Sequence, residues 1–148
     1  MALALLAASS RLTLAEVIAE NGVARTVIVV DPKATSTEAY AARQLAASLH
    51  EITGASFEIR TNSEAPASAI IVGAGAAATA AFPQTPLTQL GEEELVIRTE
   101  GDRLLLAGGR PRGTLYAVSR FLQDNCGVRW WTAWASRIPH QPSLRIAD

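Results

Sequence analysis

The chain has 148 residues, of which 49% are hydrophobic and 18% charged, and its formal net charge is −1. This size and composition predict one globular domain with a substantial core and exclude a disordered tail. The charges form no block of one sign, so we expect no nucleic-acid partner and no membrane partner. Cys126 is the single cysteine, which excludes an intrachain disulfide and a thiolate metal cluster.

The first residues allow two interpretations. Residues 1–10, MALALLAASS, form a short apolar run that ends in small residues but lacks a positive n-region. They are either a signal-peptide remnant or simply the start of a trimmed chain. On the first interpretation we expect an extracytoplasmic protein, periplasmic or secreted. We assign residues 11–132 to an α/β domain and residues 133–148 to an exit segment.

The first elements expected along the chain are a hairpin and a central strand. Residues 12–18 are extended, and Asn21-Gly22 after them suits the positive φ angles of a tight turn. Residues 26–30, TVIVV, are β-branched and apolar on both faces, which predicts a strand inside a sheet.

The next element is the clearest helix. Thr35 and Glu38 have the spacing of a capping box, in which a hydroxyl and a carboxylate satisfy backbone donors at a helix start. Gly54 is placed to end the helix in a left-handed conformation. The apolar face is expected to be buried and consists of Ala41, Leu45, Leu49 and Ile52.

Four strands and two short helical segments are expected in the middle of the chain. Polar–apolar alternation indicates a strand with one wet face, apolar runs indicate buried strands, and Gly101-Asp102 between two runs indicates a hairpin. The expected strands cover residues 57–60, 69–72, 94–99 and 103–107. The helical segments follow Gly75 and cover residues 87–90.

A second main helix and an aromatic exit complete the pattern. Pro111 suits the first turn of a helix, where its missing N–H costs nothing, and Gly127 ends that helix. Residues 128–131 are expected to leave the domain, and residues 143–146 to return as a short edge strand. The apolar face of this helix is expected at Leu115, Val118, Leu122 and Cys126.

This order of elements predicts the fold class. Hairpins mixed with crossover helices are typical of a mixed sheet. We therefore expect an α/β (α+β) fold of two layers, with two main helices on one face of a mixed β-sheet.

Candidate chemistry is sparse. Gly73-Ala74-Gly75 follows a strand and matches a loose dinucleotide fingerprint, but the match is weak in an alanine-rich chain, and we favour a simple strand-to-helix turn. Residues 92–94, three glutamates, indicate a solvated charge run, because a glycosidase pair is separated across a sugar ring. Neither His50 nor His140 has a second ligand at metal spacing. We expect no catalytic residue, no cofactor and no metal.

All three tryptophans of the chain fall within five residues, at Trp130, Trp131 and Trp134. Aromatic rings stack on the faces of sugars, so a carbohydrate platform is one interpretation. The other is that these side chains seal a core edge or a domain interface, since large aromatics dominate such contacts.

Residues 104–131 carry a resemblance to a known family, supported by residues 42–54 and 70–73. The segment resembles the end of the non-catalytic N-terminal α/β domain of alpha-glucuronidases and related bacterial glycoside hydrolases. It is similar, more distantly, to the domain that precedes the barrel in beta-hexosaminidases. The positions that carry the motif are Gly108, Gly109, Arg112, Gly113, Tyr116 and Gly127.

The resemblance implies a role in polysaccharide degradation without chemistry in this chain. In that family the catalytic acids lie in a downstream (β/α)8 barrel, so none is carried onto this sequence. We expect a non-catalytic accessory domain of a glycoside hydrolase, whose partner is the barrel of the same parent chain and whose exit segment leads toward it. Two alternatives stay open: a carbohydrate-binding module that uses the tryptophans, and a nucleotide-binding domain that uses the Gly73 loop.

Overall fold

A computed structural model describes residues 16–147 of the chain. The expected signal-peptide remnant, residues 1–10, and the first residues of the expected segment 12–18 lie outside that range. No helix within the described part combines the length and the hydrophobicity needed to cross a lipid bilayer.

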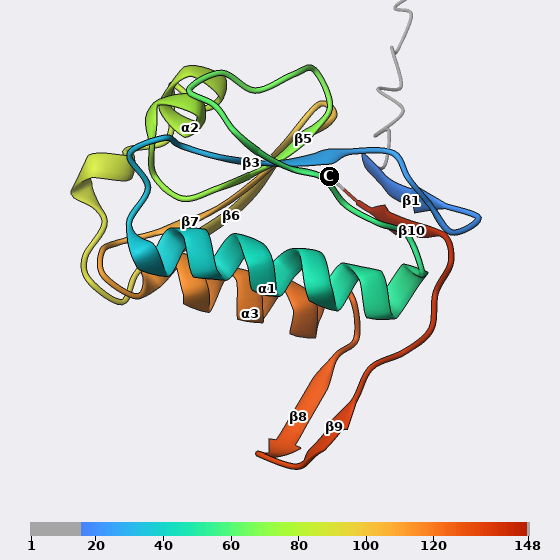
Figure 1. The fold of residues 1–148 in the computed structure, drawn as a ribbon. Helices are drawn as coiled ribbons and strands as arrows, with labels where there is room; N and C mark the ends of the chain where they lie inside the picture. Colours follow the sequence, from blue (N-terminus) through green and yellow to red (C-terminus); the bar gives the residue numbers. More distant parts are fainter. Residues whose placement is uncertain (1–15, 148) are drawn as a thin grey trace, which may run out of the picture.

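The centre of the domain is a five-stranded mixed sheet (Figure 1). Its strands, in spatial order, are β4 (Ile59–Thr61), β3 (Val27–Val30), β5 (Ala69–Val72), β7 (Arg103–Gly108) and β6 (Leu95–Glu100). The first four are parallel, and β6 pairs with β7 as the antiparallel hairpin that the sequence predicts. The mixed sheet is therefore confirmed, with β3 between two neighbours as its apolar composition requires.

Two long helices, α1 (Ser36–Thr53) and α3 (Gly113–Asp124), lie side by side on one face of this sheet (Figure 1). This confirms the expected layer of two main helices. The opposite face is partly covered by the short helix α2 (Ala76–Ala81) and the 3₁₀ turn η1 (Leu87–Gln89).

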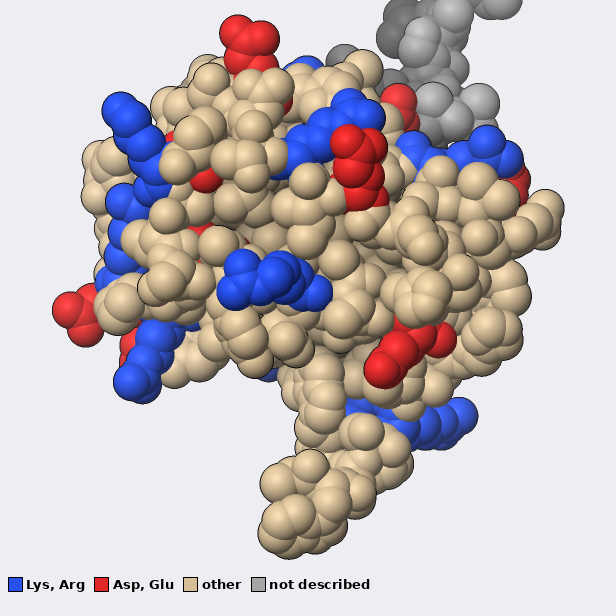
Figure 2. Space-filling model, in the orientation of Figure 1, with Lys and Arg blue, Asp and Glu red and all other residues tan. Residues whose placement is uncertain are grey.

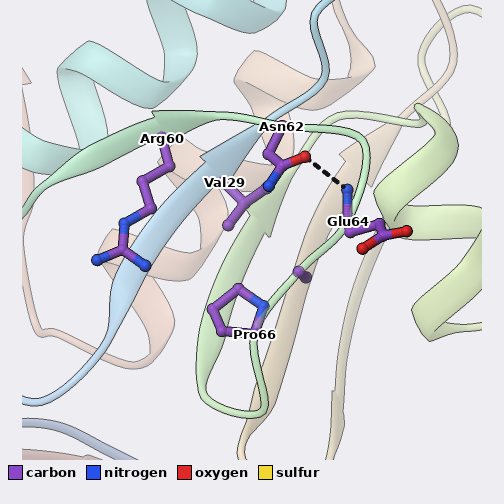
Figure 3. Close-up of a pocket in the computed structure, with 6 residues that line it drawn as sticks. Val29, Arg60, Asn62, Glu64 and Pro66 are labelled. Carbon is purple, nitrogen blue, oxygen red and sulfur yellow. Dashed lines mark hydrogen bonds between the residues drawn. The ribbon is translucent and has the colours of Figure 1, made fainter.

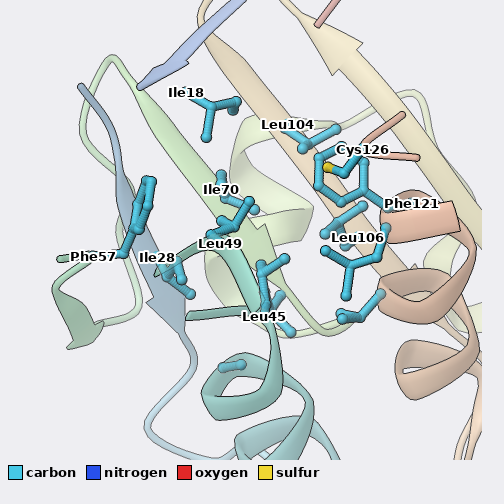
Figure 4. Packing of buried hydrophobic residues seen from close by; sticks show 14 of the residues in the cluster. Ile18, Ile28, Leu45, Leu49, Phe57, Ile70, Leu104, Leu106, Phe121 and Cys126 are labelled. Atoms are coloured by element: carbon cyan, nitrogen blue, oxygen red, sulfur yellow. The ribbon is translucent and has the colours of Figure 1, made fainter. Parts of the chain in front are cut away.

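Each face of the sheet has its own core, because successive strand residues point to opposite sides. On β7, Leu104 and Leu106 pack with α1 and α3, whereas Leu105 packs with the α2 side. Figure 4 shows the larger core, in which Leu45 and Leu49 of α1 and Phe121 of α3 meet the sheet.

Helix α1 begins and ends as its sequence predicts. The Thr35 hydroxyl accepts a hydrogen bond from the Glu38 backbone N–H at 3.2 Å, and the Glu38 carboxylate accepts one from the Thr35 N–H at 2.8 Å. Gly54 has a left-handed φ of 77° and donates its N–H to the carbonyl of His50. All four residues of the expected apolar face are buried.

Helix α3 differs from its prediction in two respects. It begins at Gly113 rather than at Pro111, because the Gly113 N–H donates to the Gly109 carbonyl and closes a turn that contains the proline. The buried face is also rotated toward Ala117 and Phe121, which leaves Leu115 only partly buried.

Three further strands complete a small second sheet, in the order β10 (Leu144–Ile146), β1 (Glu16–Glu20) and β2 (Val23–Ala24). Asn21 and Gly22, with φ angles of 50° and 74°, form the predicted tight turn between β1 and β2. The sequence did not reveal β2 as a separate strand. β10 pairs with β1, so the expected return of residues 143–146 as a short strand is confirmed.

The aromatic exit has a different form from the one expected. Residues 128–131 do not simply leave the domain, because β8 (Arg129–Thr132) pairs with β9 (Ala135–Arg137) in an antiparallel hairpin. This tryptophan hairpin, residues 129–137, projects from the helix layer (Figures 1 and 2). It spans residue 132, so the exit segment assigned to residues 133–148 begins inside a hairpin.

Candidate functional site

The glycine-rich turn between β7 and α3 is built by close backbone contact. A Cβ atom on Gly113 would lie 2.5 Å from the Glu94 carbonyl oxygen and 2.7 Å from the Gly108 carbonyl carbon. A Cβ atom on Gly108 would overlap the Gly113 backbone, and one on Gly109 would overlap the Gly91 carbonyl. Substituents at these glycines would therefore collide with neighbouring backbone, which gives the motif a structural role.

The remaining motif residues take different positions. Arg112 caps the start of α3 through its backbone and is exposed, and Tyr116, one turn later, is 37% exposed. Gly127 has a left-handed φ of 72°, which suits a residue that turns the chain away from α3. The structure brings Gly108, Gly109 and Gly113 together and leaves Gly127 at the other end of the helix.

Glu38 joins three segments at the end of the sheet where its parallel strands finish. Its carboxylate accepts hydrogen bonds from the Arg110 guanidinium at 3.3 Å and from the Ala74 N–H at 3.4 Å, besides capping α1. The Glu38 side chain is almost fully buried, whereas that of Arg110 is half-exposed. The sequence predicts only the cap, because the other two partners are distant along the chain.

Carboxylates also occupy the turn that the nucleotide alternative requires. Asp31 accepts a hydrogen bond from the Ala76 N–H at 2.8 Å, at the start of α2, and Glu38 accepts the one from Ala74. A Cβ on Gly75 would overlap the Asp31 side chain. Two negative groups thus hold the N–H groups that a pyrophosphate would need, so the geometry favours a strand-to-helix turn.

The hollows on the second face of the sheet lack a pair of carboxylates. Figure 3 shows one of them beneath the linker between β4 and β5, where Glu64 is the only acidic residue of the lining and Arg60 lies across from it. The neighbouring hollow, on the α2 side, also contains Glu64 and no second acid. Glycoside hydrolysis uses two carboxyl groups about 5–10 Å apart, and neither hollow supplies them.

The other side chains considered as catalytic groups or metal ligands within residues 16–147 either have structural partners or do not cluster. Glu94 accepts a hydrogen bond from the Gly91 N–H in an exposed turn, and the His50 imidazole lies 3.0 Å from the Ala55 carbonyl. Cys126 is buried as expected, although it follows the end of α3 at Asp124, and burial raises the pKa of its thiol to about 12. The described residues contain no group of three potential metal ligands.

The three tryptophans share one exposed hairpin. Trp130, Trp131 and Trp134 are 44%, 65% and 91% exposed, and Trp134 lies in the turn of the hairpin. The end of the hairpin is uncharged in Figure 2. At its base the Arg129 guanidinium donates to the Gln123 carbonyl at 2.6 Å, which fixes the hairpin to the end of α3.

The far end of the hairpin is anchored as well. After β9, the Gln141 N–H donates to the carbonyl of Ile52 at the end of α1, and the Pro142 carbonyl accepts from Gly22. The hairpin is therefore presented from a fixed position on the domain. Sequence reasoning missed Tyr40, which lies on the exposed side of α1 and shares a hollow with Trp130.

Comparison with known proteins identifies the family of this domain. The sequence profile described as glycosyl hydrolase family 67 N-terminus matches residues 12–121, which is most of the chain. A search of curated proteins gives no match. On the strength of the profile match, the chain belongs to the glycosyl hydrolase family 67 N-terminal domain family, that is, the alpha-glucuronidase N-terminal domain.

Proposed function

We propose that this chain is a non-catalytic accessory domain of an alpha-glucuronidase-like glycoside hydrolase and supports a (β/α)8 catalytic barrel in the same parent chain. The observation that carries the proposal is the tryptophan hairpin, anchored at both ends and uncharged at its tip. An exposed apolar projection of this kind is typical of a surface that a partner covers. Membership of the family makes a catalytic domain the fitting class of partner.

The absence of catalysis in this chain is supported by the distribution of its acids. The buried carboxylate Glu38 is engaged with Arg110 and backbone N–H groups, and Asp31 caps α2. These carboxylates hold the fold together, and neither Glu38 nor Asp31 lines any of the described hollows.

An activity assay tests this part of the proposal. Purified protein is incubated with aryl glucuronides and aryl N-acetylglucosaminides, and we expect no turnover. Turnover that survives repurification and disappears on substitution of a single Asp or Glu would contradict a non-catalytic role.

A second assay tests the hairpin as an interface. We expect acrylamide to quench tryptophan fluorescence readily and the isolated domain to self-associate as its concentration rises, because Trp131 and Trp134 are 65% and 91% exposed. Trp134→Ala should reduce both effects without lowering the melting temperature. A monomer whose fluorescence resists the quencher would show that the tryptophans belong to the core of the domain.

Carbohydrate binding is a second candidate function, and one observation favours it. Trp130 does not stand free like Trp134 but lies beside polar and aromatic residues of α1 and α3. Trp130 therefore has a different environment from Trp134, and an aromatic ring beside polar groups supports carbohydrate binding at that residue.

A further inference from the structure

A groove between α1 and α3 is lined by residues of both helices and by Trp130 of β8. Tyr40, Gln44 and Ser48 line it from α1, four residues apart along one stripe of the helix, and α3 contributes Leu115 and Ser119 among others. Residues at this spacing share a helix face, so the stripe points outward between the two helices. The hollow has a volume of about 250 Å³, enough for one monosaccharide ring.

The lining combines aromatic faces with uncharged polar groups. Tyr40 and Trp130 are each almost half-exposed, and the side chains of Gln44, Ser48 and Ser119 form no hydrogen bond with any described residue. An amide and hydroxyls offer both donors and acceptors. None of the lining residues is charged.

Arg43 of α1 and Arg120 of α3 do not line the groove. The Arg43 guanidinium carbon lies 6.0 Å from the centre of the Tyr40 ring, in the range of a cation–π contact. Arg120 forms an ion pair with Asp124 at 2.9 Å on the exposed side of α3. Because the lining itself contains no charged side chain, it suits an uncharged ligand.

We propose that this groove binds one neutral pyranose residue of a carbohydrate chain, stacked against Trp130 and Tyr40 and hydrogen-bonded by Gln44, Ser48 and Ser119. A pyranose has apolar C–H faces and a rim of hydroxyl groups, which match the aromatic faces and the free polar side chains. An apolar helix from a protein partner would instead bury three polar side chains without hydrogen bonds, at a cost for each.

This site rests on the proposed function only in that a carbohydrate-active family makes sugars the relevant ligands. It does not use Trp131 or Trp134, to which we assign the interface. Loss of one role therefore leaves the other intact.

The test uses the three indole N–H signals of the ¹⁵N-labelled protein, assigned by single substitutions. Xylohexaose and cellohexaose serve as neutral probes and trigalacturonic acid as the acidic one. We expect a saturable shift of the Trp130 signal with at least one neutral probe, at roughly millimolar concentration, and no shift of the Trp134 signal.

Matched variants separate the groove from the hairpin tip. In the Trp130 variants, which lack the indole signal, the backbone amide signals of Ser48 and Ser119 report binding. Trp130→Ala and Tyr40→Ala should each weaken binding by about tenfold, Trp130→Phe should retain most of it, and Trp134→Ala should leave it unchanged. Melting temperatures confirm that each variant is folded. A shift confined to Trp134, tighter binding of the acidic probe, wild-type binding by Tyr40→Ala, or no saturable shift with either neutral probe would overturn the proposal.

Discussion

Gly113 offers the sharpest test of the packing between α3 and the β6–β7 hairpin. A Cβ atom there would lie within 3 Å of three backbone atoms, the Glu94 O and the Gly108 C and Cα, so no side-chain rotation relieves the overlap. Overpacking costs about 1–3 kcal/mol, and contact with backbone places this case at the upper end. Alanine recovers about 1 kcal/mol through helix propensity. We expect Gly113→Ala to lower the free energy of unfolding by about 2 kcal/mol, and Gly113→Val by more.

Thermal unfolding followed by circular dichroism measures the effect. For a domain of this size, about 2 kcal/mol corresponds to a fall of roughly 4–8 °C in melting temperature. Gly91→Ala is the matched control, because its Cβ would meet only the Glu94 side chain at 3.6 Å, an ordinary contact. It should stay within about 0.5 kcal/mol of the wild type. An unchanged melting temperature for Gly113→Val would refute the close-packing argument.

Three further predictions concern buried or engaged groups. Burial raises the pKa of the Cys126 thiol from 9.0 to about 12, so the thiol ionises at a lower pH in the unfolded chain than in the folded one. The free energy of unfolding should therefore fall as pH rises from about 9 toward 12. At pH 8 the thiol should react with a disulfide reagent only in denaturant, and labelling of the native protein would contradict this burial. Glu38→Gln should lower the free energy of unfolding, measured in urea, by about 1–2 kcal/mol, because it removes the charge that Arg110 and Ala74 contact. The control Glu51→Gln, at an exposed position of α1, should change it by almost nothing. ATP and NAD should leave the melting temperature unchanged, since Asp31 and Glu38 already occupy the Gly73 loop; a rise of several degrees would revive the nucleotide alternative.

The sequence predicts the parts of this fold that local rules determine. The capping box at Thr35, the left-handed Gly54 and the Asn21-Gly22 turn each depend on residues a few positions apart, and the structure confirms all three. The start of α3 was misplaced because the turn that delays it is closed by a hydrogen bond from Gly113 to Gly109, which competes with the preference of proline for a first helical turn.

Contacts between distant segments were beyond the reach of a single sequence. Nothing in the local pattern shows that Glu38 meets Arg110, or that the segment after α3 folds back as a hairpin held by Gln123 and Ile52. The grouping of three tryptophans did signal a special surface. That Trp130 lies beside the two helices while Trp131 and Trp134 are more exposed depends on the path of β8, which only the fold determines.

The different positions of Trp130 and of Trp131 and Trp134 would let one domain bind a sugar and contact a catalytic domain. Trp130 and Trp131 are neighbours on β8, where the pairing with β9 shifts its register, and only Trp130 is among the residues that line the groove. Trp130 lies against the α1–α3 groove, while Trp131 and Trp134 remain available for a partner. The hydrogen bonds of Arg129, at the start of the hairpin, and of Gln141, a few residues after it, tie this part of the chain to the helix layer. A catalytic domain that packed on Trp131 and Trp134 would therefore be held at a fixed orientation to the groove, and a sugar chain bound there would be held in register with that domain.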